Sequence, residues 1–134
     1  MAQMPSIDTW LKEAKADPDF AQCGMYLVHN GVVRATPKAE ARGVETDGVQ
    51  PGETVGRLTF GYDAARVGAA VAEARALPGI SCVRVWLNEG ELAVGDDIML
   101  VLVGGDIRPR VIDALQQLVG TLKNECVTEV EHRA

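Results

Sequence analysis

The feature that most constrains this chain of 134 residues is an uninterrupted apolar run from Ile98 to Val103. Six residues are too few for a membrane-spanning helix, which needs about 20. A short run that is apolar at every position is instead typical of a central β-strand covered on both faces. The run therefore predicts a globular domain built around a sheet, with no segment that crosses a membrane.

Other parts of the chain supply neighbours for this strand. Alternating or continuous apolar residues predict further strands at Cys23–Arg34, Val55–Tyr62, Ile80–Leu87 and Cys126–Glu131. Asn30-Gly31 interrupts the first of them, which indicates a turn or a bulge at the glycine.

Two main helices are predicted between the strands. Asp63 can cap a helix with apolar residues at helical spacing, and Pro78-Gly79 would end it. The second helix follows Gly104-Gly105-Asp106 and closes in Leu122-Lys123. Pro109 fits its first turn, where a missing N–H costs little.

A shorter helix precedes the first strand. Ser6 can cap it, and it would end near Asp17-Pro18. The order of elements predicts an α+β fold, in which two main helices pack on one face of a mixed, mostly antiparallel sheet. The chain length suits a single domain spanning residues 1–134.

The segment 35–54 differs from the rest of the chain. It contains two prolines, three glycines and many charges, with neither helical nor strand periodicity. Loops of this length inside a compact domain are uncommon and often functional. We therefore predict a long, mobile surface loop.

Composition narrows the function classes. A hydrophobic content of 47% argues against disorder, and a net charge of −6 argues against a general nucleic-acid binder. The three cysteines, Cys23, Cys82 and Cys126, are widely spaced and lack the C-x-x-C pattern. With no secretory signal recognisable at the N-terminus, we expect reduced thiols and a cytoplasmic protein.

Few residues carry obvious chemistry. The chain has no nucleophile elbow, P-loop, zinc-protease motif or dinucleotide fingerprint. His29 and His132 lack metal-ligand spacing, so no metal and no cofactor is predicted. The acidic residues of 89–97 could form a hard-cation site, but a charged hairpin tip explains them better.

Basic residues are the remaining candidates. Arg108 and Arg110 lie in the opening turn of the second main helix, where cations oppose the helix dipole unless an anion sits among them. Together with Arg34 and Lys123, they indicate phosphate or carboxylate binding. The alternative is that they are ordinary surface side chains.

Three of these basic residues belong to a wider pattern. Residues 89–97 read EGELAVGDD and precede the apolar strand, and an Arg-led helix then closes in Leu122-Lys123. The separation of fifteen residues between Arg108 and Lys123, with Gly31-Val32-Val33-Arg34 upstream, completes the pattern. Over residues 22–125 the chain resembles the large, catalytic subunit of molybdopterin synthase.

The resemblance implies an α/β-hammerhead type fold and a homodimer. It also implies a partner, a small ubiquitin-like subunit whose Gly-Gly C-terminus carries a thiocarboxylate. The expected reaction transfers sulfur from this group to cyclic pyranopterin monophosphate, giving molybdopterin. By matching positions, Lys123 would be catalytic and Arg34 and Arg108 would hold anionic groups. Arg110 and Lys38 are further candidate contacts to substrate.

Three departures keep a second interpretation open. Ile107 stands where the family usually has His, Val130 stands where it has a second lysine, and the sequence ends at Ala134, before a further family arginine. The chain could therefore be a non-catalytic relative, acting as an anion- or pterin-binding or regulatory dimeric module. A chance motif match in another anion-binding domain is a third interpretation.

Helix geometry bears on the homodimer. Fifteen residues of helix separate Arg108 from Lys123 by roughly 22 Å. A pterin monophosphate is too small to touch both, so one site that uses both would take them from different protomers.

Overall fold

The computed structural model describes residues 3–38 and 54–134. The elements follow in the order α1 (Ile7–Ala16), the 3₁₀ turn η1 (Pro18–Gln22), β1 (Met25–Val32), β2 (Val55–Tyr62), α3 (Ala64–Arg75), β3 (Ile80–Leu87), β4 (Gly90–Ala93), β5 (Asp97–Gly105), α4 (Arg108–Thr121), the π turn η2 (Leu122–Cys126) and β6 (Val127–Arg133). None of the described helices is long and apolar enough to span a membrane.

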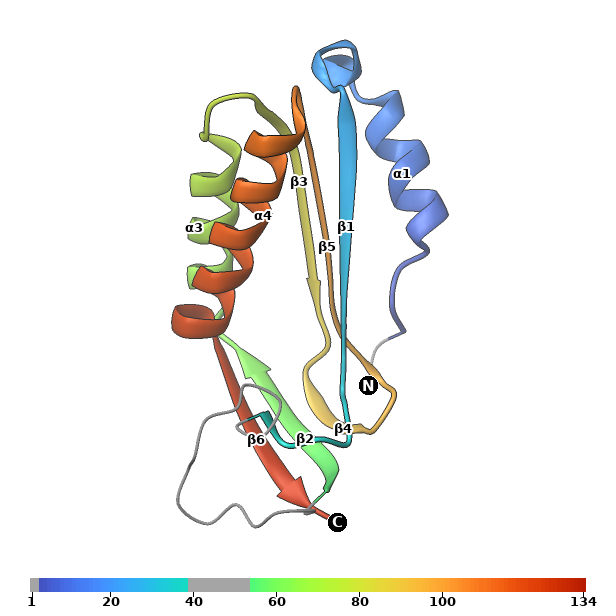
Figure 1. Ribbon diagram of the computed structural model, residues 1–134, viewed down its shortest axis with the longest axis vertical. Coiled ribbons are helices and arrows are strands. Elements are labelled where there is room, and N and C mark those ends of the chain that lie inside the picture. The colour runs from blue at the N-terminus through green and yellow to red at the C-terminus, as the bar shows by residue number, and fades with distance from the viewer. Residues whose placement is uncertain (1–2, 39–53) are drawn as a thin grey trace.

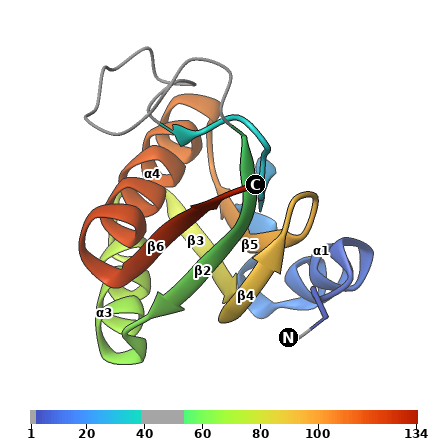
Figure 2. The ribbon, with the colours of Figure 1, turned by 90° about the horizontal axis from the view of Figure 1, so that it is seen from below.

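The strands form two three-stranded sheets, in the orders β1-β5-β3 and β4-β2-β6. Every strand pairing within the described residues is antiparallel. The β4-β2-β6 sheet closes one end of the β1-β5-β3 sheet (Figures 1 and 2). The predicted α+β class is confirmed, but the strands divide between two sheets where the sequence suggested one.

A strand that the sequence analysis treated as a hairpin tip explains this division. Residues Gly90–Ala93 form β4, which pairs with β2 and leaves β5 to β1 and β3. Gly90 and Gly95, at either end of this excursion, have φ of +128° and +94°, which other residues rarely adopt. They allow the chain to leave one sheet and return to it.

The central strand is β5, as the apolar run predicts. Its residues Met99–Val103 are fully buried. Helices α3 and α4 cover one face of its sheet and α1 lies on the other side (Figure 1). Helix α1 is attached through Arg84 of β3, which pairs with Glu13 at 3.2 Å and lies 5.7 Å from the centre of the Trp10 ring.

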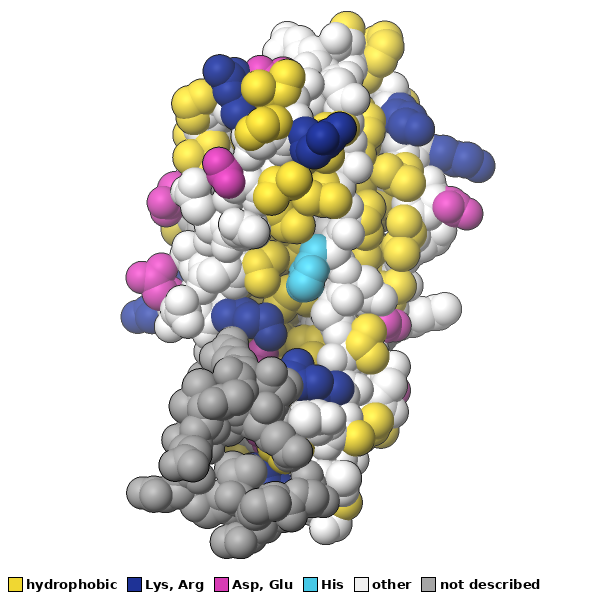
Figure 3. Space-filling model, viewed as in Figure 1, with side chains coloured by type: hydrophobic (Ala, Val, Ile, Leu, Met, Phe, Trp, Pro, Cys, Tyr) yellow, Lys and Arg dark blue, Asp and Glu magenta, His cyan; other side chains and the backbone are white. Residues whose placement is uncertain are grey.

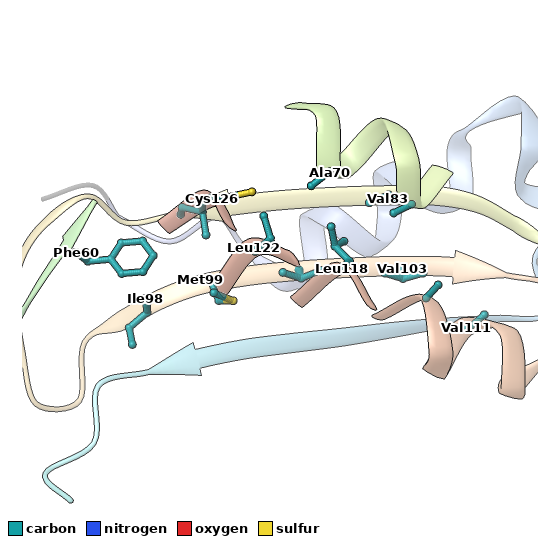
Figure 4. Packing of buried hydrophobic residues seen from close by; sticks show 14 of the residues in the cluster. Phe60, Ala70, Val83, Ile98, Met99, Val103, Val111, Leu118, Leu122 and Cys126 are labelled. Carbon is teal, nitrogen blue, oxygen red and sulfur yellow. The ribbon is translucent and has the colours of Figure 1, made fainter. Parts of the chain in front are cut away.

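The core is continuous between the two sheets. Phe60 from β2 packs into the same cluster as Met99 and Val103 of β5, beneath the buried stripe of α4 (Figure 4). That stripe is Val111, Ala114 and Leu118, and the π turn extends it to Leu122 and Cys126. Because the wider turn keeps both of these side chains buried, the chain turns from α4 into β6 without leaving the core.

The local predictions hold closely. Strands β2 and β3 have the predicted bounds, and β1 shifts its register between Gly31 and Val32, where a bulge was expected. The predicted caps of α1 and α3 are present, since Ser6 and Asp63 accept backbone N–H groups at 3.2 and 3.1 Å. The mobility predicted for 35–54 concerns mostly residues 39–53, which lie outside the described residues.

Candidate functional site

A pocket of about 390 Å³ opens where the two sheets meet. Its lining comes from five regions of the chain: His29, Gly31 and Val32 of β1 with Val33, Arg34 and Lys38 after it; Val55 and Leu58 of β2; Ile98 and Met99 of β5; Lys123 of η2; and Glu129 and Glu131 of β6. Apolar and charged side chains contribute to the same cavity. Such a pocket suits a ligand with both a flat apolar part and an anionic group.

Two irregular segments bring basic residues to this pocket. The bulge after Gly31 is followed by Val33, which is buried, and then by Arg34, which is exposed at the pocket. At the other side, the π turn presents Lys123, whose side chain is about one-third exposed. Regular continuation of either element would direct these residues differently.

A largely buried carboxylate, that of Glu129, joins two lysines inside the pocket. Lys123 Nζ donates to Glu129 Oε1 at 3.4 Å, and Lys38 Nζ donates to Glu129 Oε2 at 3.2 Å. Only 14% of the Glu129 side chain is exposed. Burial by itself raises the pKa of Glu129, but the positive charges of Lys123 and Lys38 outweigh it and hold the pKa below its ordinary value. Glu129 is therefore charged at neutral pH.

Glu131 and His29 also contribute to the charge distribution in the pocket. Glu131 Oε2 accepts the backbone N–H of Lys38 at 3.0 Å, and Glu131 also pairs with Arg133 at 3.6 Å. Burial, and then the charge of Lys123, lower the pKa of His29, so its imidazole is neutral at pH 7. Among the described residues that line the pocket, three basic side chains outnumber two carboxylates, and this balance favours an anionic ligand.

The structure separates the predicted site residues into two groups. Arg34, Lys38 and Lys123 line the pocket together. Arg108 and Arg110 lie at the opposite end of α4, where Arg110 Nη1 pairs with Asp106 Oδ2 at 2.7 Å. On the face in Figure 3, one set of basic side chains lies in the upper part of the molecule and another just above the grey residues, with apolar side chains between them.

Two family positions also have clear locations. Ile107 is half-exposed just before α4, beside Arg108. Val130 is 54% exposed and falls between the pocket residues Glu129 and Glu131 on β6, so it faces away from the pocket. Within residues 3–38 and 54–134, no three His, Cys, Asp or Glu side chains are arranged to hold a metal ion.

The sequence analysis did not propose three titratable residues that line the pocket, His29, Glu129 and Glu131. The alternation Glu129-Val130-Glu131 places both glutamates on one face of β6, and that pattern was readable. The sequence did not show which residues would lie beside these glutamates in the folded protein. His29 was considered only as a metal ligand, and its place beside Lys123 follows from the meeting of β1 and η2.

Comparison with known proteins bears on this arrangement. A family model described as "MoaE protein" matches residues 3–125. A molybdopterin synthase from Staphylococcus aureus is similar at 17% identity with a TM-score of 0.66, over 84% of this chain and 77% of that one. A molybdopterin cofactor biosynthesis protein E from Burkholderia multivorans is similar at 18% identity with a TM-score of 0.68, over 98% of this chain and 88% of that one.

A complex is among the similar structures. The complex of subunits 1 and 2 of molybdopterin-converting factor from Helicobacter pylori matches at 16% identity with a TM-score of 0.63, over 95% of this chain and 78% of that chain. No curated protein sequence gives a significant match. The resemblance over residues 22–125 is confirmed, and the family match extends to residue 3. This chain belongs to the MoaE family, that of the large subunit of molybdopterin synthase.

Proposed function

We propose that this chain is the large subunit of a molybdopterin synthase, transferring sulfur from the C-terminal thiocarboxylate of a small subunit to cyclic pyranopterin monophosphate. Membership of the MoaE family supports a role in molybdenum cofactor biosynthesis. The observation that carries the finer proposal is the pocket in which Arg34, Lys38 and Lys123 converge over an apolar floor.

The proposed reactants suit these residues. The donor is an anionic thiocarboxylate, the acceptor carries a phosphate, and negative charge develops on oxygen as the acyl group reacts. Cations fixed in a partly dry pocket stabilise such charges more strongly than they would in water. Lys123 is the proposed catalytic residue because it matches the family lysine fifteen residues after Arg108 and lines the pocket from the π turn. Arg34, exposed at the pocket, is the proposed phosphate contact.

The start of α4, which carries Arg108, enters the proposal through a homodimer. Helix α4 keeps Arg108 far from Lys123 of the same protomer, because fourteen helical residues extend about 21 Å. A two-fold dimer would bring Arg108 of the partner subunit to the pocket. Arg110 is a weaker candidate for this role, since Asp106 already neutralises it.

A non-catalytic relative is the second candidate. The observation that favours it is Val130, which occupies the position of a family lysine and faces away from the pocket. Ile107 adds to it, because an exposed isoleucine replaces a group able to donate hydrogen bonds. Such a protein would keep the pocket and bind the pterin or another anion without turnover.

Complementation separates these candidates. A bacterial strain lacking its large subunit would receive this chain, its Lys123→Ala variant, or the control Lys12→Ala, which removes an exposed lysine of α1. We expect the wild type and Lys12→Ala to restore molybdoenzyme activity and Lys123→Ala to fail. Failure of a stably expressed wild type, also when supplied with its own small subunit, would favour the non-catalytic relative.

A further inference from the structure

The strongest unexplained feature of the pocket is a carboxylate shared by two lysines from different segments. Each oxygen of Glu129 accepts from one ammonium group, Lys123 at 3.4 Å and Lys38 at 3.2 Å. The lysines come from the π turn after α4 and from the chain beyond β1, so it is the tertiary fold that brings them together. The carboxylate is their only common partner among the described residues.

Burial makes this arrangement more than a surface ion pair. The side chain of Glu129 is 14% exposed, and those of Lys38 and Lys123 are 32% and 30% exposed. A shielded carboxylate that contacts two ammonium groups restricts the rotamers of both long side chains. Without it, two like charges in one pocket would repel each other and turn toward solvent.

The alternation of β6 shows why the second cation comes from elsewhere. Val130 is apolar and faces away from the pocket, so position 130 of β6 supplies no cation beside Lys123. Lys38 enters the pocket from the chain after β1 and is anchored twice to β6, through its Nζ to Glu129 and through its backbone N–H to Glu131 at 3.0 Å.

We infer that Glu129 is a positioning residue that holds Lys38 and Lys123 as one cationic pair, so that Lys38 supplies the second positive charge to an anion bound at Lys123. The inference deepens the proposed function and rests on it for the reaction served. The charged and titratable neighbours of the pair in the pocket are His29, Arg34 and Glu131.

A titration tests the pair without any enzymatic assay. Carbon-13 NMR of the Glu129 carboxyl would be followed against pH in the wild type, Lys38→Met, Lys123→Met and the control Arg57→Met, which removes an exposed partner of Glu91. We expect a midpoint below the ordinary 4.5 in the wild type, raised by each lysine substitution and unchanged in the control. Lys38→Arg, which keeps the charge, should preserve the low midpoint. A titration midpoint of Glu129 that is unchanged in Lys38→Met would overturn the inference.

An assay of sulfur transfer tests whether the pair of lysines contributes to turnover. With thiocarboxylated small subunit and cyclic pyranopterin monophosphate, Lys38→Met and Glu129→Gln should each lower kcat by about 10²-fold, with smaller changes in KM for the small subunit. Lys38→Arg should retain most of the turnover. Full wild-type turnover in Lys38→Met would overturn the assigned role of Lys38. If the wild type itself transfers no sulfur, the proposed function fails, and the titration alone decides whether the pair exists.

Discussion

The two ends of helix α4 carry the same kind of charge in opposite surroundings. At its start, Arg108 and Arg110 are exposed, and Arg110 pairs with Asp106 one turn away. After its end, Lys123 is partly buried and shares Glu129 with Lys38. The first end is a local, solvated arrangement, whereas the second exists only because three segments converge: η2, β6 and the chain after β1. The same residue types are therefore poor guides to function until their surroundings are known.

Removal of the Lys123 charge should have the largest effect at the pocket end. We expect Lys123→Met to lower the kcat of sulfur transfer by about 10²–10³-fold, the usual loss when one preorganised electrostatic group is removed. The unfolding free energy should fall by about 1 kcal/mol or less, because Lys38 still neutralises Glu129. Steady-state kinetics and urea denaturation measure the two effects. A large stability loss would mean that Lys123 is mainly structural.

Two apolar residues, one at each end of α4, allow the packing of these ends to be compared. Leu122 is fully buried, whereas Ile107 is 52% exposed. Leu122→Ala should cost about 2–5 kcal/mol of unfolding free energy through lost burial and the remaining cavity, and Ile107→Ala about 0.5 kcal/mol or less. Urea denaturation of both variants gives the comparison. Similar losses in a dimer would instead indicate that Ile107 is buried between protomers.

The first end of α4 should matter only through a partner subunit. We expect Arg108→Ala to lower kcat/KM by about tenfold and Arg110→Ala by less, since Asp106 already holds Arg110. Mixing Arg108→Ala and Lys123→Ala protomers tests the arrangement. If the two residues act across a two-fold axis, random reassociation restores about a quarter of the wild-type activity. No restoration, despite confirmed exchange of subunits, would contradict the shared site.

Lowering the pH should reduce the folding stability contributed by the pocket end of α4 by a small amount. It should not affect the contribution of the first end. Both His29 and Glu129 have a lowered folded-state pKa, so each contributes stability above its ordinary pKa that is lost as pH falls through the folded value. The loss begins near pH 6.5 for His29 and near pH 4.5 for Glu129. Urea midpoints measured from pH 8 to pH 3 should therefore fall less steeply in His29→Gln above pH 5 and in Glu129→Gln below it. Arg110→Ala should leave the slope unchanged.

Local patterns in the sequence were sufficient for most of the fold. The bounds of β2 and β3, the caps Ser6 and Asp63 and the bulge after Gly31 all follow from residues close to one another. Burial of Met99–Val103 likewise follows from one apolar run. These features depend on backbone preference and side-chain periodicity, which act over a few residues. The family pattern that links residues 89–97, Arg108 and Lys123 was readable for the same reason.

Strand pairing and the composition of the pocket required the tertiary structure. Periodicity shows which face of a strand is apolar but not which strand lies beside it, so the placement of β4 beside β2, and hence the second sheet, was not predicted. The same limit hid Glu129, because its meaning depends on Lys38 and Lys123 arriving from separate elements. The sequence by itself determined the helices and the strands other than β4, the central position of β5, and the basic residues Arg34, Lys38 and Lys123 that line the pocket. Only the tertiary structure decided that those cations share a carboxylate, since long-range contacts are made by packing and not by local preference.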